Sequence, residues 1–188
     1  MKILYITQLT EDRIKEINLI KKEYDFVDFL SWNGINIDKL EVDVFFIGCD
    51  PESVCFKDYL ARYLWDNEEY DAIVCIGSIF DMWGISSLTE IYHKIPICFS
   101  VLECIKVPLS AIEIMILDKF ENIFLLDVDN SVMDYISVME KESGNLMINN
   151  FLNKIKILSK SDYFSNIVEE IENCLKKRDI IAGVEIVL

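Results

Sequence analysis

Short apolar runs alternate along the chain with segments in which apolar residues recur every three or four positions. The clearest run is Ala72–Ile76, five apolar residues that end at Gly77 and Ser78. A run of this length, bounded by a turn signal, is typical of a strand that is buried on both faces. Further strands are predicted over residues 2–7, 25–32, 42–47, 94–100, 122–126, 154–158 and 180–188.

Amphipathic segments between these runs predict helices. Residues 11–22 carry Ile14, Ile17 and Ile20 on one helical face, and Thr10 precedes them as a candidate N-cap. A helical face with this spacing packs against a sheet while the opposite face remains in solvent. Three later helices are predicted over residues 107–119, 131–144 and 167–175.

Two further helix starts are predicted from local signals. Asp50 as N-cap and Pro51 at the first helical position form a coherent start. Ser87 has the capping-box spacing to Glu90, which predicts a helix from Ser87 to His93. Residues 79–86 are then left as a loop.

The alternation of strands and helices predicts an α/β fold. We expect one domain over residues 1–188, with three layers and a mostly parallel sheet of roughly six or seven strands joined by right-handed crossovers. This architecture is Rossmann-like or flavodoxin-like. The strand order does not follow from the pattern.

The charge balance narrows the set of partners. The chain has 33 acidic and 18 basic residues and a net charge of −15. Binding of nucleic acid requires Lys and Arg at the phosphates, so nucleic acid is disfavoured, as is an anionic membrane surface. Two interpretations remain open: a solvated acidic surface, or a face that binds a basic protein partner or mimics the charge of nucleic acid.

Other compositional features favour a cytoplasmic protein. No apolar run approaches the ~18 residues that a membrane span requires, and the first apolar run is too short for a signal peptide. The six cysteines form no C-x-x-C pair, and His93 is the sole histidine. This pattern predicts reduced thiols and no metal site of the Cys/His kind.

Polar residues follow several predicted strands. The carboxyl ends of parallel strands meet at one edge of a sheet, where α/β proteins bind ligands. Backbone N–H groups at Gly77 and Ser78 are candidates for a phosphate or carboxylate, the alternative being a glycine that permits a sharp turn. The candidate ligand-binding residues are Gln8, Asp50, Gly77, Ser78, Asp81, Trp83 and Ser100.

Some of these candidates have a second interpretation. Asp50 suits a general base or a ribose acceptor, but also a helix cap. Trp83 suits stacking on a ligand or partner, but also covering the sheet edge. The patterns G-x-G-x-x-G and G-x-x-x-x-G-K-S/T are absent, which disfavours a dinucleotide and a P-loop nucleotide. No cofactor and no catalytic residue is identified.

Two segments resemble known families. Asp127 and Asp129, which follow the apolar run 123–126, resemble the nucleophile motif of haloacid-dehalogenase phosphatases, which implies a Mg²⁺ role. The alternative is a solvated strand-to-helix turn with caps. Residues 70–102 are similar in outline to parts of lumazine synthases and of aspartate/glutamate racemases, although Gly77 and Ser78 stand where the racemases carry a catalytic cysteine.

Together these features predict a cytoplasmic protein that binds a small molecule. A hydrolase or transferase that acts through carboxylates at the carboxyl edge of the sheet is consistent with the residues there. The alternative is a non-catalytic acidic interaction or sensor protein on an enzyme-like scaffold. The pattern specifies neither the ligand nor the oligomeric state.

Overall fold

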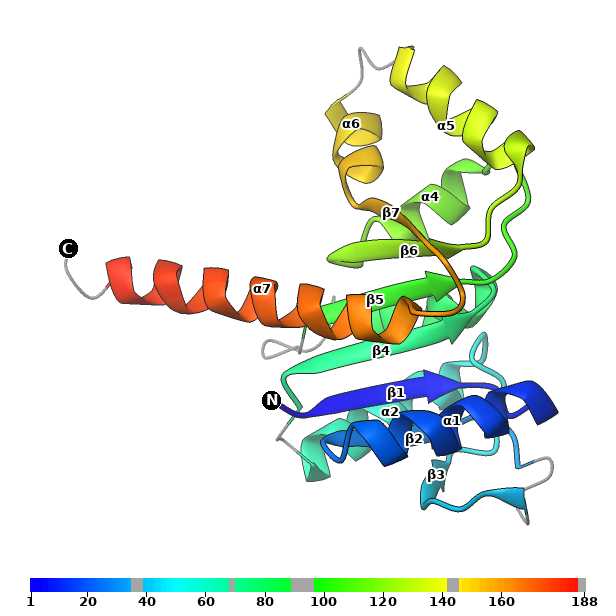
Figure 1. Ribbon diagram of the computed structural model, residues 1–188, viewed down its shortest axis with the longest axis vertical. Helices are drawn as coiled ribbons and strands as arrows, with labels where there is room; N and C mark the ends of the chain where they lie inside the picture. Colours follow the sequence, from blue (N-terminus) through cyan, green and yellow to red (C-terminus); the bar gives the residue numbers. More distant parts are fainter. Residues whose placement is uncertain (35–38, 68–69, 89–96, 142–145, 186–188) are drawn as a thin grey trace.

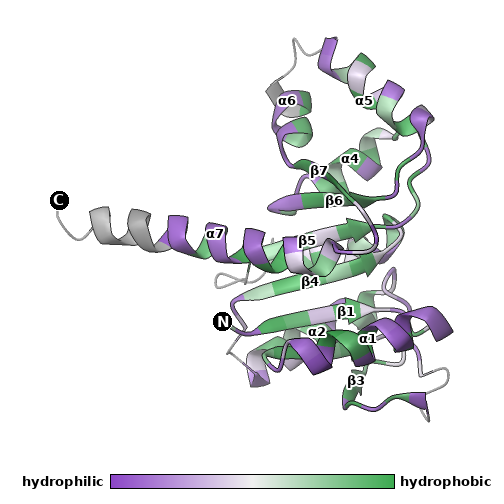
Figure 2. Ribbon diagram, viewed as in Figure 1, coloured by the Kyte–Doolittle hydropathy of each residue, from purple (hydrophilic) through white to green (hydrophobic). Residues whose placement is uncertain are grey.

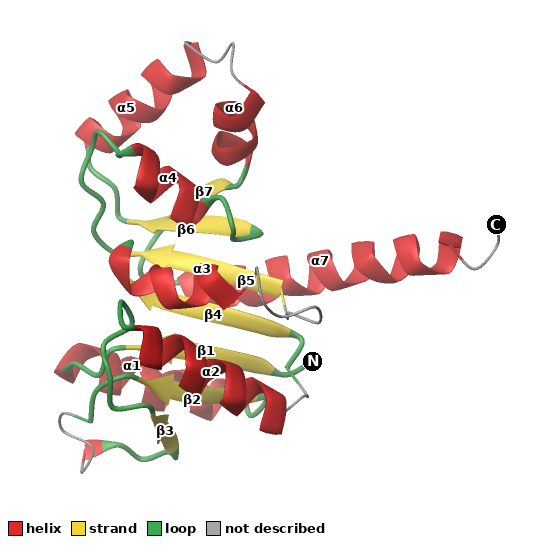
Figure 3. Cartoon of the chain, turned by 180° about the vertical axis from the view of Figure 1, so that it is seen from behind, coloured by secondary structure: helices red, strands yellow, loops and turns green. Residues whose placement is uncertain are grey.

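The computed structural model describes residues 1–34, 39–67, 70–88, 97–141 and 146–185. In this part of the chain seven parallel strands form one sheet, and helices cover both of its faces (Figures 1 and 3). The predicted α/β architecture is confirmed. None of the helices in these ranges has the length and apolar character that crossing a bilayer requires.

The strands are short and mostly apolar. They are β1 (Ile3–Thr7), β2 (Val27–Ser31), β3 (Val44–Phe46), β4 (Ala72–Gly77), β5 (Ile97–Leu102), β6 (Asn122–Leu126) and β7 (Ile155–Leu158). The helical elements are α1 (Glu11–Glu23), α2 (Val54–Asp66), the 3₁₀ turn η2 (Phe80–Met82), α3 (Trp83–Leu88), α4 (Ala111–Leu117), α5 (Asn130–Lys141), α6 (Leu146–Asn153) and α7 (Tyr163–Glu185).

The strand order is β3-β2-β1-β4-β5-β6-β7, with every neighbouring pair parallel. The chain moves outward from β1 to β3, returns to the other side of β1, and then moves outward again from β4 to β7. This is the Rossmann type of order with a seventh strand added, and it reverses between β1 and β4. The loops that follow these two strands therefore diverge in opposite directions.

Each face of the sheet packs against its own set of helices. Ile3 and Tyr5 of β1 face the core under α1 and α7, whereas Leu4 and Ile6 face the core under α2, α3 and α4. Figures 1 and 3 show the two helical layers from opposite sides. Burial of both faces explains why the strands read as continuous apolar runs, and Figure 2 shows the inner strands mostly in the hydrophobic colour.

A final strand is predicted over residues 180–188, and this prediction is wrong for residues 180–185. These residues continue α7, which extends beyond the amino ends of the strands (Figure 1). No proline or turn signal separates them from the preceding helix. A short apolar run such as Ile180 and Ile181 fits a strand and a buried helix equally well, so the pattern did not distinguish the two.

The predicted loop over residues 79–86 is also wrong. It forms η2 and α3, and Ser87 lies inside α3, where its Oγ donates to the Trp83 carbonyl at 2.9 Å. The start signal is instead Asp81, whose carboxylate accepts from the Ser78 N–H at 2.6 Å. This is the bond by which the acidic residue of a capping box holds the start of a helix. The predicted helix end at His93 lies outside the described residues.

Helix α2 begins three residues later than its sequence signals indicated. Its N-cap is Ser53, whose side chain accepts from the Phe56 N–H at 3.2 Å. Asp50 instead accepts from the Glu52 N–H at 2.9 Å, which closes a turn before the helix. Asp and Pro favour tight turns as well as helix starts, and here they form a turn that precedes the helix in the sequence.

Gly84 allows α3 to lie against the start of α2. A Cβ atom there would lie 2.5 Å from Phe56 Cδ1 and 2.8 Å from the Pro51 carbonyl oxygen. Replacing a helical Gly by Ala ordinarily stabilises a helix by about 1 kcal/mol. At this site the clash outweighs that gain, because overpacking a buried contact costs about 1–3 kcal/mol.

We therefore expect Gly84→Ala to lower the free energy of unfolding, measured by urea denaturation followed by circular dichroism. Gly34→Ala is the matched control, because its Cβ would make only ordinary contact with the Phe46 ring at 3.8 Å. Equal stability of Gly84→Ala and the wild type would contradict the tight packing of α3 on α2.

Helix α4 starts with a complete capping box. The Ser110 Oγ accepts from the Glu113 N–H at 3.3 Å, and the Glu113 carboxylate accepts from the Ser110 N–H at 2.7 Å. Hydrogen bonds from the side chain and backbone of Ser110 hold the pKa of Glu113 below its usual range. A carboxyl whose folded pKa is lowered stabilises the fold above its unfolded pKa, and this contribution is lost as the pH falls through the folded pKa.

We expect Ser110→Ala to lower the free energy of unfolding by about 1 kcal/mol at pH 7. The deficit should shrink in acid, because protonation of Glu113 removes the charge that the box stabilises. Urea denaturation at pH 7 and pH 3 measures both values. Ser165→Ala is the control, since the Ser165 Oγ bonds only the Asp162 carbonyl among the described residues. A Ser110→Ala deficit that is the same at both pH values would argue against this role of Glu113.

Candidate functional site

A polar cleft of about 450 Å³ lies at the carboxyl ends of β1 and β4. It occupies the point at which the strand order reverses, because the loops after these two strands turn away from each other. We call it the switch-point cleft. Its lining residues are Thr7, Gln8, Thr10, Arg13, Ile76, Gly77, Ser78, Asp81, Glu103 and Cys104.

The loop after β1 is fixed by a side chain of the neighbouring strand end. Asn33 accepts from the Leu9 N–H at 2.7 Å and donates to the Leu9 carbonyl at 3.3 Å. Leu9 itself is buried, and the Thr10 Oγ1 accepts from the Arg13 N–H at the start of α1. The donors at Leu9 and Arg13 are therefore satisfied within the protein.

The turn after β4 is closed by Asp81. Its Oδ2 accepts from both the N–H and the Oγ–H of Ser78, at 2.6 and 2.8 Å. A Cβ atom on residue 77 would lie 2.5 Å from this same oxygen, so the turn requires Gly77. The Ser78 N–H was a candidate donor to a phosphate or carboxylate ligand. It already donates its hydrogen bond to the Asp81 carboxylate.

A buried arginine forms one wall of the cleft. The side chain of Arg13 is 6% exposed. Its Nη1 donates to Glu16 at 2.5 Å, to the Tyr5 hydroxyl at 3.0 Å and to the Tyr163 hydroxyl at 3.3 Å. Its Nη2 pairs with Glu103 at 2.7 Å. We call these five residues the Arg13 cluster.

The Arg13 cluster perturbs the titration of its members. Burial by itself lowers the pKa of Arg13, but the nearby Tyr5, Glu16 and Glu103 raise it above its usual range, so the guanidinium stays charged. Burial also raises the pKa of Tyr5, which donates its hydroxyl hydrogen to Glu16 at 2.7 Å. The cluster therefore contains a permanent cation held by neutral hydroxyls and carboxylates.

The structure brings together four of the seven predicted ligand-binding residues. Gln8, Gly77, Ser78 and Asp81 line the switch-point cleft, whereas the remaining three do not. The latter are Asp50, Trp83 and Ser100.

The three remaining candidates have other positions. Asp50 closes the turn before α2, and Trp83 begins α3 with 44% of its surface exposed. Ser100 was expected at the end of its strand, but β5 continues to Leu102. Ser100 is therefore fully buried, and its Oγ has no hydrogen-bond partner among the described residues.

Sequence reasoning missed Arg13, because it lies within an otherwise ordinary amphipathic helix. A signal was present, however. A cation in the first turn of a helix faces the positive end of the helix dipole, and Arg13 also adjoins the apolar stripe at Ile14. An arginine in such a place needs buried acceptors, which Glu16 supplies one turn later. Glu103 belongs, with Ser100, to the polar residues that the sequence predicts at the carboxyl edge of the sheet. Cys104 was missed, because the strand was expected to end at Ser100 and β5 continues to Leu102.

The Asp127–Asp129 segment forms a capped turn. Asp127 has a φ of 47° and accepts from the Lys160 N–H at 3.1 Å. Asp129 accepts from the Ser131 hydroxyl at 2.6 Å and from the Val132 N–H at 3.1 Å, and these bonds hold its pKa below the usual range. In the described part of the chain, no group of three or more Asp, Glu, Cys or His side chains is arranged to hold a metal ion. The geometry favours a capped turn over a Mg²⁺ site for this segment.

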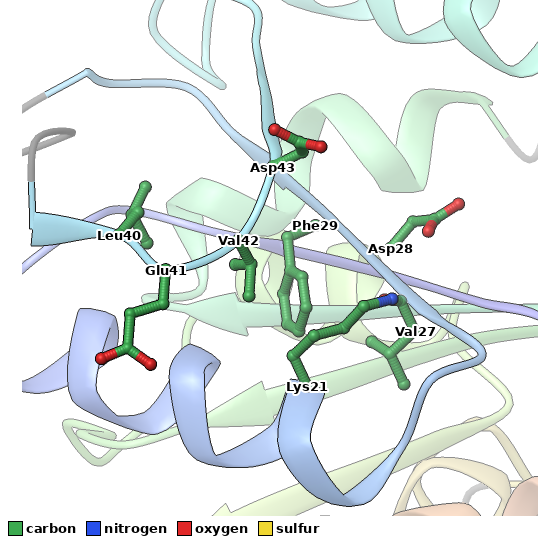
Figure 4. Close-up of a pocket in the computed structure, with 8 residues that line it drawn as sticks. All are labelled: Lys21, Val27, Asp28, Phe29, Leu40, Glu41, Val42 and Asp43. Atoms are coloured by element: carbon green, nitrogen blue, oxygen red, sulfur yellow. The ribbon is translucent and has the colours of Figure 1, made fainter.

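A second hollow, of about 550 Å³, lies at the amino end of β2 (Figure 4). It exists because β3 pairs only with Phe29–Ser31 and leaves the start of β2 uncovered. Lys21 extends along this edge, and its Nζ donates to the carbonyls of Asp25 and Val27 at 2.8 and 3.0 Å. Lys21 thus donates hydrogen bonds to carbonyl groups at an uncovered strand edge, which is a structural role.

No model of a protein family, no curated protein and no solved structure matches this chain. The fold type is shared by proteins with many functions and does not select among them. The feature of this structure that bears on function is therefore the geometry of the switch-point cleft.

Removing the Arg13 charge tests the structural importance of the Arg13 cluster. Arg13→Met leaves the carboxylates of Glu16 and Glu103 without their main partner, and breaking a buried ion pair in this way costs about 3 kcal/mol or more. Urea denaturation measures the loss. Arg62→Met is the control, because Arg62 is 81% exposed and its Nε lies 3.9 Å from Asp66. An exposed pair of that kind contributes less than about 0.5 kcal/mol, so similar losses in the two variants would contradict the assignment.

Proposed function

We propose that the protein binds a small polar molecule in the switch-point cleft. One observation carries the proposal: polar side chains from both halves of the sheet, Gln8 after β1 and Ser78 and Asp81 after β4, line one hollow at the strand reversal. Proteins of this architecture place their ligands at that point, because the diverging loops leave a crevice there.

The unused polar atoms in the cleft suggest the chemistry of the ligand. The described hydrogen bonds of the Asp81 carboxylate involve Oδ2 only, and the Gln8 side-chain amide has no described partner. These atoms suit a molecule that presents hydroxyl or amino hydrogens. Nucleotide phosphates are disfavoured, because the Ser78 N–H is taken by Asp81 and the Leu9 N–H by Asn33.

Carboxylates are the acid–base groups nearest to such a ligand. Asp81 and Glu103 both line the cleft, and the sole histidine, His93, lies outside the described residues. A hydrolase or transferase on this scaffold would move protons through these two carboxylates. Binding is the function we propose, and proton transfer by Asp81 or Glu103 is its catalytic extension.

A second candidate function is the recognition of a basic protein partner. Phe80 and Trp83 are 48% and 44% exposed, and Ile112 and Met115 on the neighbouring α4 are 57% and 61% exposed. Exposed apolar side chains on neighbouring elements are typical of interaction surfaces. The net charge of −15 would attract a cationic partner to such a surface.

Filling the cleft tests the proposed function. Gln8→Trp adds a bulky side chain at its rim without removing a described hydrogen bond, so it should abolish binding there. Asp58→Trp places the same side chain on the exposed face of α2, away from the cleft, and should leave binding unchanged.

The measurement combines native mass spectrometry of freshly purified protein with ligand-observed NMR against small hydroxy acids, amino acids and sugars. We expect a retained or added small molecule in the wild type and in Asp58→Trp, and its loss in Gln8→Trp. Binding that is equal in both variants, or no binding to the wild type in either assay, would reject the cleft as the site.

A further inference from the structure

We propose that Arg13 forms a carboxylate-binding subsite of the switch-point cleft, and that Glu103 fills this subsite in the structure. The ligand of the cleft would then carry a carboxylate that takes the place of the Glu103 side chain. This inference rests on the proposed function and names the chemical class of its ligand. Three observations on the Arg13 cluster support it.

The guanidinium of Arg13 is held in place without Glu103. Its Nη1 is bonded to Glu16, Tyr5 and Tyr163, and the two tyrosine hydroxyls also lie 2.9 Å from each other. Both tyrosines are buried, so this side of the guanidinium is fixed. Loss of the Glu103 contact would leave Nη2 in the same position at the wall of the cleft. A donor that is fixed before binding loses little entropy when it binds an anion.

Glu103 is the exposed and separable partner of this arginine. It directly follows β5 and is 36% exposed, compared with 21% for Glu16. Its two oxygens bond two cations, Arg13 Nη2 at 2.7 Å and Lys160 Nζ at 3.5 Å. Since Glu16 already pairs with Arg13 at 2.5 Å, release of Glu103 does not leave the buried arginine without a counter-charge.

The space around Glu103 allows it to move. Thr10, Arg13 and Glu103 line the switch-point cleft and also a groove of about 910 Å³ between α1 and the start of α7. Glu103 therefore stands in the wall between two hollows. If it turns toward the groove, which Lys160 also lines, the Arg13 Nη2 is left open to a molecule in the cleft.

The local charge favours a carboxylate over a phosphate. Glu103 is a monoanion with a planar, two-oxygen head, and a ligand carboxylate reproduces both its shape and its charge. A dianionic phosphate would add negative charge beside Glu16 and Asp81, which already face Arg13 and the cleft. Like charges at such short range are mutually destabilising.

Chemical rescue tests this subsite. Glu103→Ala removes the internal carboxylate, and sodium acetate is the probe that replaces it. At ~100 mM acetate we expect Tm of Glu103→Ala to rise by about 3 °C relative to sodium chloride at the same ionic strength, if the probe binds with a Kd near ~10 mM. The Tm of the wild type should rise by less than about 1 °C, because Glu103 competes for the Arg13 guanidinium.

Asp118→Ala is the matched control. Asp118 is 38% exposed and pairs with Lys154 at 2.9 Å, so it resembles Glu103 in exposure and partner, but it lines no part of the cleft. Acetate should not raise its Tm above the chloride value. Glu103→Gln provides a second variant for the case in which Glu103→Ala does not fold, and acetate should stabilise it more than the wild type.

Each outcome decides the inference. Stabilisation of the Glu103 variants by acetate and not by chloride supports it, and equal rises in the Asp118→Ala control overturn it as a general salt effect. Stabilisation by phosphate that exceeds that by acetate overturns the carboxylate assignment. A small molecule retained by the wild type and lost in Gln8→Trp, together with no acetate response, would leave the proposed function standing and reject the subsite. Stabilisation of the Glu103 variants by acetate, without a small molecule that the wild type retains and Gln8→Trp loses, would reject the proposed function instead.

Discussion

The parallel pairing of β1 with β4 is the constraint on which the rest of this structure depends. All five residues of β1 are buried, and the strand is paired along its whole length on both sides, to β2 and to β4. The chain must therefore build outward from β1 in both directions, with helices on both faces. Because the loops after β1 and β4 then turn away from each other, the crevice between them is a consequence of topology and exists whatever residues line it.

The residues that do line the crevice give it an unusual character for this fold. In dinucleotide-binding proteins the first loop is glycine-rich and presents free N–H groups to a pyrophosphate. Here Leu9 is buried and bonded to Asn33, and Asp81 bonds the Ser78 N–H. Side chains of the protein thus accept hydrogen bonds from these backbone donors, and the polar groups still open in the cleft belong to side chains. This shift is why we propose a small polar ligand in place of a nucleotide.

The Arg13 cluster gives the crevice one rigid wall. A buried charge is tolerated only when acceptors surround it, and Arg13 draws these from β1, α1, the loop after β5 and the start of α7. Three regions that are far apart in the sequence are thereby joined at one point: β1 with α1, the loop after β5, and the start of α7. The same network that stabilises the fold leaves one nitrogen of the guanidinium at the cleft, bonded to the exposed Glu103. A role of Arg13 in stabilising the fold is therefore compatible with the proposed role of Arg13 in binding a ligand.

The sequence by itself determined the fold class and most strands, since apolar runs such as Ile123–Leu126 can be buried only between two helical layers. It also indicated Gln8, Ser78 and Asp81, because polar residues directly after such runs fall at one sheet edge. Local signals failed where the same spacing occurs twice: the capping-box spacing of Ser87 predicts a helix start, whereas the helical segment begins at the hydrogen bond from the Ser78 N–H to Asp81. Only the tertiary structure decided the strand order and the Arg13 cluster. Both depend on contacts between residues distant in sequence, and no local periodicity encodes which distant acceptors will surround a buried charge.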